Sequence, residues 1–253
     1  SKDRFIWAIA EDGTVYGTHD ATEGAVYLNT QVWAVLSGAA SEEQARTCME
    51  TLNRELSTDY GLQLCAPPVT TMPVRIMAAR LFNPGTKENA GIFNHPQGWA
   101  VIAECMLGNG NRAYEYHSNY LPAKFNDKAE IRGSEPYVHC QSTHAKYSPM
   151  HGAARLPWLT GAATWCYYSS TAYMLGIRAE LDGMRIDPCL PDHWDGYQAT
   201  RRFRGMELKI DVKNPDRVQT GVKRITVDGA VIDSTLVPLD KLSDGCRIEV
   251  LMG

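Results

Sequence analysis

The sequence has 253 residues, of which 44% are hydrophobic and 21% are charged, and its formal net charge is −4. This length is enough for a large core in one or two domains. The balance of charge lacks the basic stripe of a nucleic-acid-binding protein. No run approaches the roughly 20 apolar residues of a membrane span, and no signal peptide is visible. We therefore expect a globular cytoplasmic protein with neither nucleic acid nor a membrane as partner.

Cysteine usage points to a reducing compartment. The count is odd and no CxxC motif occurs, which argues against a disulfide framework. Several of the cysteines lie in apolar segments that are predicted to be helical, where a free thiol behaves as a small hydrophobic group. The seven residues are Cys48, Cys65, Cys105, Cys140, Cys166, Cys189 and Cys246.

The chain begins at Ser1 and enters a strand-like apolar run over 4–10 almost at once. Two explanations stay open at this point. The chain is a piece of something longer, or its terminus has been processed.

The first two-thirds of the sequence is predicted to be mostly helical. An apolar segment over 27–39 ends near Gly38, and the capping-box spacing of Ser41 and Gln44 opens a helix that reaches about Leu56. Further helices are predicted over 97–107, 112–120, 136–144 and 157–175. Polar, proline-containing loops such as 64–73 and 83–94 separate them, and such loops often carry binding groups.

After about residue 180 the pattern becomes that of strands. The segments 200–203 and 206–212 alternate apolar and polar residues, 184–188 is short and extended, and 247–252 closes with another strand. Asp228-Gly229 predicts the turn of a hairpin over 225–232. A small antiparallel β domain should therefore follow the helical region.

The stretch 157–165 offers chemistry at a predicted helix start. Pro157 suits a first helical turn, and Thr160 and Gly161 would then lie among N–H groups that the helix leaves free. A hydroxyl, free N–H groups and a glycine together favour an anion such as phosphate or a dicarboxylate. The alternative is an ordinary helix start packed in a core.

The loop 87–95 places a cation, a carboxylate, an amide and an imidazole close together, in Lys87, Glu88, Asn89 and His95. Such groups are costly to bury unless they are paired. The loop either lines a ligand or forms a solvated turn before a helix.

Other polar clusters are less specific. Asp127, Glu130 and Glu135 could include a general acid–base pair, but charge-rich loops are mostly solvated. The spacing of His144 and His151 matches no common zinc pattern. The acidic segment 187–195 lacks the spacing of a calcium loop and is interpreted as a structural turn. No GxSxG elbow, Walker loop or GxGxxG motif is present.

Taken in order, several motifs resemble the C-terminal part of the cellobiose/chitobiose phosphorylase family, glycoside hydrolase family 94. The resemblance covers nearly the whole chain. It rests on Trp33–Ala39, Lys87–Phe93 with His95, Leu107–Gly110, Glu135–Tyr137, Trp158–Gly161, Ile186–Cys189 and Trp194–Gly196.

The resemblance implies a mainly α fold. Residues 1–180 would complete part of an (α/α)6 catalytic barrel, and residues 181–253 would form a small antiparallel, jelly-roll-like domain. Too few helices are present for a closed barrel, so another chain segment would complete it.

The implied reaction is inverting phosphorolysis of a β-linked disaccharide to a sugar 1-phosphate and a free sugar. His95, Gln141, Thr160 and Gly161 match the family's phosphate-binding positions. Phe82, Lys87 and Glu88 match positions at the sugar sites. Inorganic phosphate is a co-substrate, and no cofactor or metal is implied.

The resemblance also implies partners. The family's general acid, an aspartate, and an arginine that helps to hold phosphate lie upstream of the matching part, so the upstream half of the enzyme would be needed for activity. A homodimer is expected. The segment 74–82 matches neither the cellobiose-type nor the chitobiose-type acceptor pattern, which leaves the disaccharide open.

Two other functions remain as alternatives. One is an inverting glycoside hydrolase of the same barrel fold, which would have no need for an anion pocket. The other is a non-catalytic carbohydrate-binding fragment, in which the β domain binds glycans.

Overall fold

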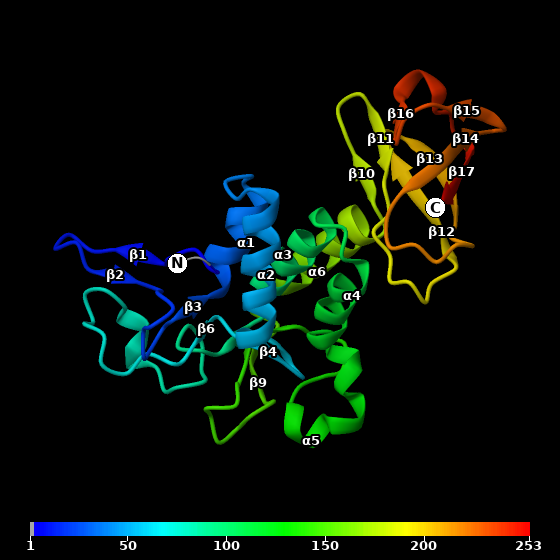
Figure 1. Ribbon diagram of the computed structural model, residues 1–253. Coiled ribbons are helices and arrows are strands. Elements are labelled where there is room, and N and C mark those ends of the chain that lie inside the picture. Colours follow the sequence, from blue (N-terminus) through cyan, green and yellow to red (C-terminus); the bar gives the residue numbers. More distant parts are fainter. Residues whose placement is uncertain (1–2) are drawn as a thin grey trace. The chain divides into compact units, whose positions relative to one another are not determined.

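Residues 3–253 are described by a computed structural model (Figure 1). The prediction about the chain start at Ser1 lies outside the described residues. The chain forms two units, one of residues up to 103 with 115–167, and one of residues 104–114 with 168–253.

Helices carry much of the first two-thirds, as the sequence predicted. They are α1 (Leu28–Leu36), α2 (Glu42–Leu56), α3 (His95–Met106), α4 (Gly110–Asn119), α5 (Ala129–Arg132) and α6 (Ala162–Tyr168), with 3-10 turns η1 (Ala78–Leu81) and η2 (Pro122–Lys128) and a π-helical turn η3 (Ser169–Met174). The capping box of α2 is confirmed, because the Gln44 N–H donates to Ser41 Oγ and the Ser41 N–H donates to Gln44 Oε1.

The helices α1 and α2 lie side by side in the first unit (Figure 1). Val32 of α1 and Leu52 of α2 are fully buried. The thiol of Cys48 in α2 reaches the carbonyl oxygen of Gln31 in α1. Burying this apolar face supplies the packing that a helix of 9 residues needs to be stable.

Short strands tie the connecting segments of the first unit together. The pairs are β1 (Ala8–Ile9) with β2 (Val15–Tyr16), β3 (Val26–Tyr27) with β6 (Cys65–Ala66), and β4 (Ser57–Thr58) with β5 (Gly61–Leu62). The largest sheet of this unit has three antiparallel strands, β7 (Ile92–Phe93), β8 (Cys140–Thr143) and β9 (Ala154–Pro157). This sheet holds the candidate site.

One predicted helix is wrong at this sheet, and another begins later than predicted. The segment predicted as a helix over 136–144 contains strand β8, which pairs with β7 on one side and β9 on the other. The helix predicted from Pro157 begins only at Ala162, because Pro157 ends strand β9. Trp158 has a φ of 70°, which no α-helix tolerates, so the chain must turn before the helix can start.

The second unit contains the predicted β domain. Its larger sheet has the strand order β12 (Gly196–Phe203), β13 (Met206–Lys213), β17 (Arg247–Met252), β14 (Val222–Val227) and β15 (Ala230–Ile232). A second sheet joins β10 (Ile177–Ala179), β11 (Gly183–Ile186) and β16 (Leu236–Pro238), which precedes the 3-10 turn η4 (Leu239–Lys241). A helical region followed by a β domain is thus confirmed.

One feature of the larger sheet differs from the prediction. The pair β13–β17 is parallel, so the sheet is mixed and not wholly antiparallel. The hairpin β14–β15 is as predicted, with Asp228 and Gly229 both at positive φ in its turn. Leu208 of β13 and Ile248 and Val250 of β17 lie in the buried core of the larger sheet.

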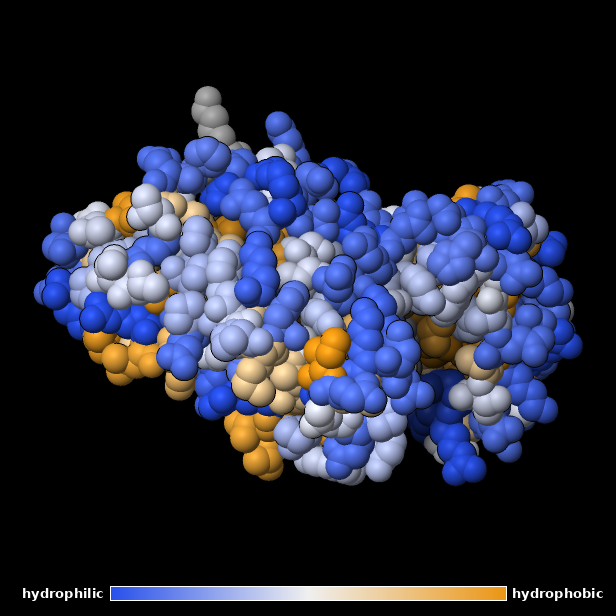
Figure 2. Space-filling model, turned by 90° about the horizontal axis from the view of Figure 1, so that it is seen from below, coloured by the Kyte–Doolittle hydropathy of each residue, from blue (hydrophilic) through white to orange (hydrophobic). Residues whose placement is uncertain are grey.

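The surface is mostly hydrophilic on the face shown in Figure 2, with separate hydrophobic groups. Exposed large apolar side chains of the first unit include Leu81, Trp158 and Leu159. Within residues 3–253, no helix has both the length and the apolar character that crossing a membrane requires. None of the cysteines, all of which lie among the described residues, forms a disulfide.

Candidate functional site

The three-stranded sheet brings distant parts of the chain to one of its ends. Strand β7 ends where β8 begins, since Phe93 faces Ser142, and β9 ends there too, since Pro157 faces Cys140. The backbone continues this pairing beyond the strands: the Asn94 N–H donates to the Gln141 carbonyl oxygen at 2.9 Å. His95, Gln141 and the Thr160-Gly161 pair therefore gather at the same end of the sheet.

His95 is the first residue of α3 and directly follows the pairing of β7. Its ring packs edge-to-face against Phe93 and Trp99, with centroids 5.1 and 4.9 Å away. Burial lowers the pKa of His95 below its usual value. The imidazole is thus held by two aromatic rings at a helix start, where backbone N–H groups are free.

Gln141 is the second residue of β8 and is half-buried. Its side-chain oxygen is buried and has no hydrogen-bond partner among the described residues. Oxygen and nitrogen of such an amide are assigned from hydrogen bonding and can be exchanged, so the buried atom is an unsatisfied polar end of either kind. A buried amide with an unpaired end is a good candidate for contact with a ligand or water.

Thr160 and Gly161 immediately precede α6. The Thr160 hydroxyl accepts a hydrogen bond from the Ala162 N–H at 3.0 Å, so it caps the helix start. Gly161 is exposed, and a Cβ placed on it would have no atom of the described residues within 4 Å. The Thr-Gly pair lies at a helix start as predicted, although that start is at Ala162.

The helices α3 and α6 are packed together close to these residues. Gly98 lies against the backbone of Trp165, and the rings of Trp99 and Trp165 meet edge-to-face at 5.7 Å. Both helices begin at the end of the sheet described above. The contact therefore fixes His95 and the Thr160-Gly161 pair relative to one another.

The loop before His95 is held in an unusual conformation. Lys87 and Ala90 have φ values of 47° and 61°, a region that side-chain-bearing residues rarely adopt. Buried Asn89 supports this shape, since its amide donates to the carbonyls of Val69 and Phe82 and accepts from the Val69 N–H. The loop thus has a defined conformation, which favours the interpretation that it lines a ligand over that of a solvated turn.

Of the three predicted sugar-contacting residues, Lys87 and Glu88 lie in this loop and Phe82 lies directly before it. The Lys87 amine lies 5.0 Å from the centre of the Phe82 ring. Glu88 borders a hollow of about 240 Å³ that sequence reasoning missed. Its other lining residues are Trp7, Tyr27, Asn29, Leu64, Met77 and Ala79.

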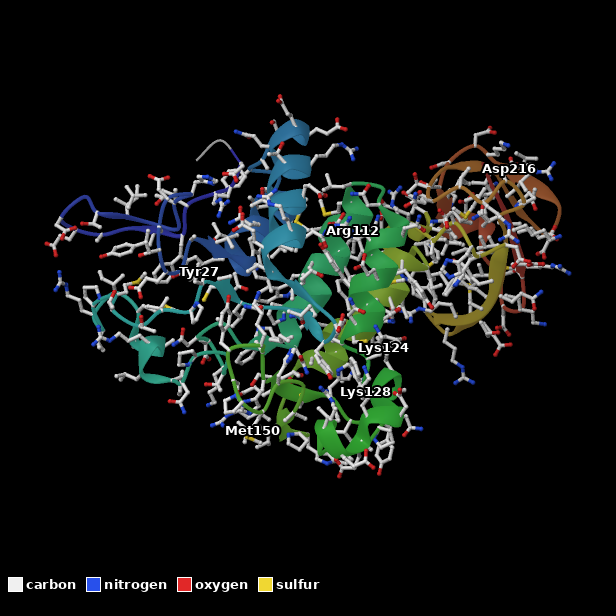
Figure 3. All side chains as sticks on the ribbon, turned by 60° about the horizontal axis from the view of Figure 1, so that its bottom comes forward. Tyr27, Arg112, Lys124, Lys128, Met150 and Asp216 are labelled. Carbon is white, nitrogen blue, oxygen red and sulfur yellow. The ribbon has the colours of Figure 1, made fainter. Side chains whose placement is uncertain are left out.

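An aromatic pair forms one wall of this hollow. Trp7 stacks on Tyr27, which is labelled in Figure 3, with centroids 4.6 Å apart. Aromatic faces beside a carboxylate and an amide suit a flat, hydroxyl-rich ligand. The sequence signal was the Trp7 side chain in the run 4–10, which periodicity alone marks only as a strand.

The remaining polar clusters do not join the site. Asp127 and Glu130 are exposed, and Glu135 accepts from Trp158 Nε1 at 3.3 Å. His144 pairs with the Ser148 hydroxyl at 2.8 Å. Within the described part of the chain, no three His, Cys, Asp or Glu side chains are grouped to hold a metal ion.

The acidic segment 187–195 belongs to the second unit. Asp192 accepts a hydrogen bond from the Asn111 amide at 2.6 Å and donates its own N–H to the Asn111 side-chain oxygen. These contacts are those of the structural turn that the sequence predicted.

Comparison with known families shows which family the chain belongs to. The family described as "Glycosyl hydrolase 94 superfamily, catalytic domain" matches residues 1–176. The chain belongs to this superfamily. The family described as "Glycosyl hydrolase family 65, C-terminal domain" matches residues 177–231, in the β domain.

Individual relatives agree with this family. N,N'-diacetylchitobiose phosphorylase from Vibrio proteolyticus is 39% identical over 247 residues, which are 98% of this chain and 31% of that protein. Solabiose phosphorylase from Paenibacillus borealis is 33% identical over 237 residues, 94% of this chain and 31% of that protein. The chain thus spans about a third of the length of these two relatives.

A likeness to solved structures is weaker. The GH92 family glycosyl hydrolase ccman5 aligns with 96% of this chain and 31% of its own, with a TM-score of 0.39 and 15% identity. A likeness at this level carries no argument about function.

Proposed function

We propose that this chain is part of an inverting glycoside phosphorylase. The enzyme would cleave a β-linked disaccharide with inorganic phosphate to give a sugar 1-phosphate and a free sugar. The observation that supports the proposal is the pairing of β7, β8 and β9, because His95, Gln141 and the Thr160-Gly161 pair all lie in or just beyond the strand ends at one end of this sheet.

The phosphate role follows from the chemistry of these groups. An imidazole, an amide and a hydroxyl can each donate a hydrogen bond to a phosphate oxygen. Two helices begin at the same place, which adds free N–H groups and a partial positive charge. Exposed Gly161 leaves room for an anion to approach the backbone.

The sugar role is assigned to Phe82, Lys87 and Glu88. Lys87 and Glu88 can bind hydroxyl groups, and the Phe82 ring can pack on the apolar face of a pyranose. Phosphate would attack the anomeric carbon from the side opposite the glycosidic oxygen, so the configuration inverts. The departing oxygen takes a proton from a general acid and leaves as the hydroxyl of the free sugar.

The general acid is assigned to a part of the enzyme upstream of this chain. Of the carboxylates near the site, Glu88 is assigned above to sugar contact, and Glu135 accepts a hydrogen bond from Trp158 Nε1. The upstream part would also complete the (α/α)6 barrel. We further propose a cytoplasmic homodimer that needs phosphate as co-substrate and neither cofactor nor metal.

The test is phosphate dependence. The complete enzyme, with this chain and its upstream part, is incubated with β-linked disaccharides in the presence and absence of phosphate, and sugar 1-phosphate is quantified. We expect turnover only with phosphate, and the α-anomer as product from a β-linkage. Release of two free sugars without phosphate would instead identify a hydrolase.

A further inference from the structure

Arg132 is a buried cation with no carboxylate beside it. It ends helix α5, and only 3% of the residue is exposed. Among residues 3–253, no aspartate or glutamate oxygen pairs with its guanidinium, and its Nε is buried without a partner. The charge-rich loop was predicted to be solvated, and its carboxylates Asp127 and Glu130 are exposed, whereas Arg132 is buried.

Such an arrangement needs an explanation because arginine cannot shed its charge by losing a proton. Burying an ion without a counter-charge is strongly unfavourable. The nearby cations Lys124 and Lys128, labelled in Figure 3, avoid this cost because both are exposed to water.

The contacts of Arg132 are to neutral groups, and two of them lie at the two ends of strand β8. One guanidinium nitrogen donates to the Thr143 hydroxyl at 2.8 Å, and another donates to Cys140 Sγ at 3.4 Å. The guanidinium carbon also lies 5.6 Å from the centre of the Phe125 ring. Gln141 lies on the strand between the two anchored residues.

Asn94 contacts the same strand at Cys140. Its amide nitrogen donates to both the carbonyl oxygen and the Sγ of Cys140, each at 3.0 Å. Asn94 directly precedes His95, and Cys140 directly precedes Gln141. Contacts from Arg132 to Cys140 and from Asn94 to Cys140 therefore connect Arg132 to the residues that directly precede the two candidate phosphate ligands.

The positive charge of Arg132 acts on His139, which directly precedes strand β8. The pKa of His139 is lowered to about 4, first by burial and then by the charge of Arg132. A field that disfavours a second cation favours an anion by the same physics.

We infer that Arg132 is a positioning residue for phosphate: it orients Gln141 through β8 and supplies a buried positive charge that the bound phosphate compensates. This inference rests on the proposed function. It adds a residue that the family resemblance leaves without a role.

The experiment uses the complete enzyme with the variants Arg132→Met and Arg132→Lys. The exposed Arg46, paired with Glu42 on α2, gives the matched control Arg46→Met. For each variant, the KM for phosphate and the KM for the disaccharide are measured separately, together with the rise in Tm caused by inorganic phosphate.

For Arg132→Met we expect the phosphate KM to rise about tenfold and the phosphate-induced rise in Tm to shrink, with little change in the disaccharide KM. Arg132→Lys keeps the charge but cannot contact Thr143 and Cys140 with one planar group, so about a threefold rise is expected. Arg46→Met should change neither KM.

An unchanged phosphate KM, or equal rises in both KM values, would overturn the inference. If Arg132→Met does not fold, Arg132→Lys decides: a phosphate KM and a Tm response equal to those of the wild type would make Arg132 purely structural. A wild-type enzyme that turns over without phosphate would reject the proposed function itself.

Discussion

Gly98 of α3 packs directly on the backbone of Trp165 in α6: a Cβ on Gly98 would lie 2.8 Å from the Trp165 carbonyl oxygen. Backbone cannot yield as a flexible side chain can. We therefore expect Gly98→Ala to destabilise the chain and Gly98→Val to do so more strongly, by about 1–3 kcal/mol. Urea unfolding of the purified chain measures this. Equal stability of all three proteins would mean that the two helices are not packed as described.

Gly161 is the contrasting glycine. It has an ordinary φ and open space around it, so nothing in residues 3–253 requires a glycine there. We expect Gly161→Ala to leave the stability unchanged and to raise the phosphate KM of the complete enzyme, because the added methyl group meets the bound anion. A stable variant with wild-type phosphate KM would remove Gly161 from the site.

His95→Ala should weaken phosphate binding and turnover together. Losing one hydrogen bond to a charged group costs about 1.5–3 kcal/mol, which corresponds to roughly tenfold or more in the phosphate KM. Steady-state kinetics at varied phosphate measure the change, and exposed His151→Ala serves as the control. A folded His95→Ala enzyme with unchanged phosphate dependence would contradict the assignment.

His139 should make the stability depend on pH. Its pKa is about 4 in the folded chain, mainly because of burial, against about 6.5 in an unfolded chain. Above about pH 6.5 neither state is protonated there, and stability is undiminished. As the pH falls from 6.5 towards 4, the unfolded state gains the proton first, so stability is lost across this window.

His139→Gln removes this proton uptake. The variant should therefore show a shallower fall in Tm between pH 6.5 and 4 than the wild type. The same substitution at exposed His151 is the control, and thermal unfolding at several pH values is the measurement. Parallel Tm curves for wild type and His139→Gln would show that His139 is freely protonated in the folded chain.

The 253-residue chain alone should have no measurable phosphorylase activity. Loss of a positioned general acid typically costs about 10²–10⁴-fold, and the upstream phosphate-binding arginine implied by the family would be absent as well. Activity should return when the upstream part is supplied, joined or as a second chain. Formation of sugar 1-phosphate is the readout, and robust turnover by the chain alone would point to an acid within it.

Local sequence signals predicted the elements whose stability is local. The capping box at Ser41 and Gln44 and the Asp228-Gly229 turn each depend on residues close together in sequence, and both are present. The approximate positions of α2, α3 and α4 follow from apolar spacing in the same way.

Strand β8 could not be found by such signals. Its partner strands are about 50 residues earlier and about 14 later, and four residues are too few to show alternation. The family resemblance proposed His95, Gln141, Thr160 and Gly161 as phosphate ligands without showing that strand pairing places them at one end of a sheet. The burial of Arg132 could not be predicted for the same reason, because it depends on contacts with Thr143 of β8 and with the Phe125 ring.

The register of β8 also limits how this protein can change in length during evolution. An inserted or deleted residue between α5 and β8 that shifted the strand by one position would turn Gln141 to the opposite face of the sheet. The same change in the connection from β8 to β9, residues 144–153, can be absorbed by the turn without moving Gln141. Among natural variants, indels should therefore be tolerated after β8 and selected against just before it.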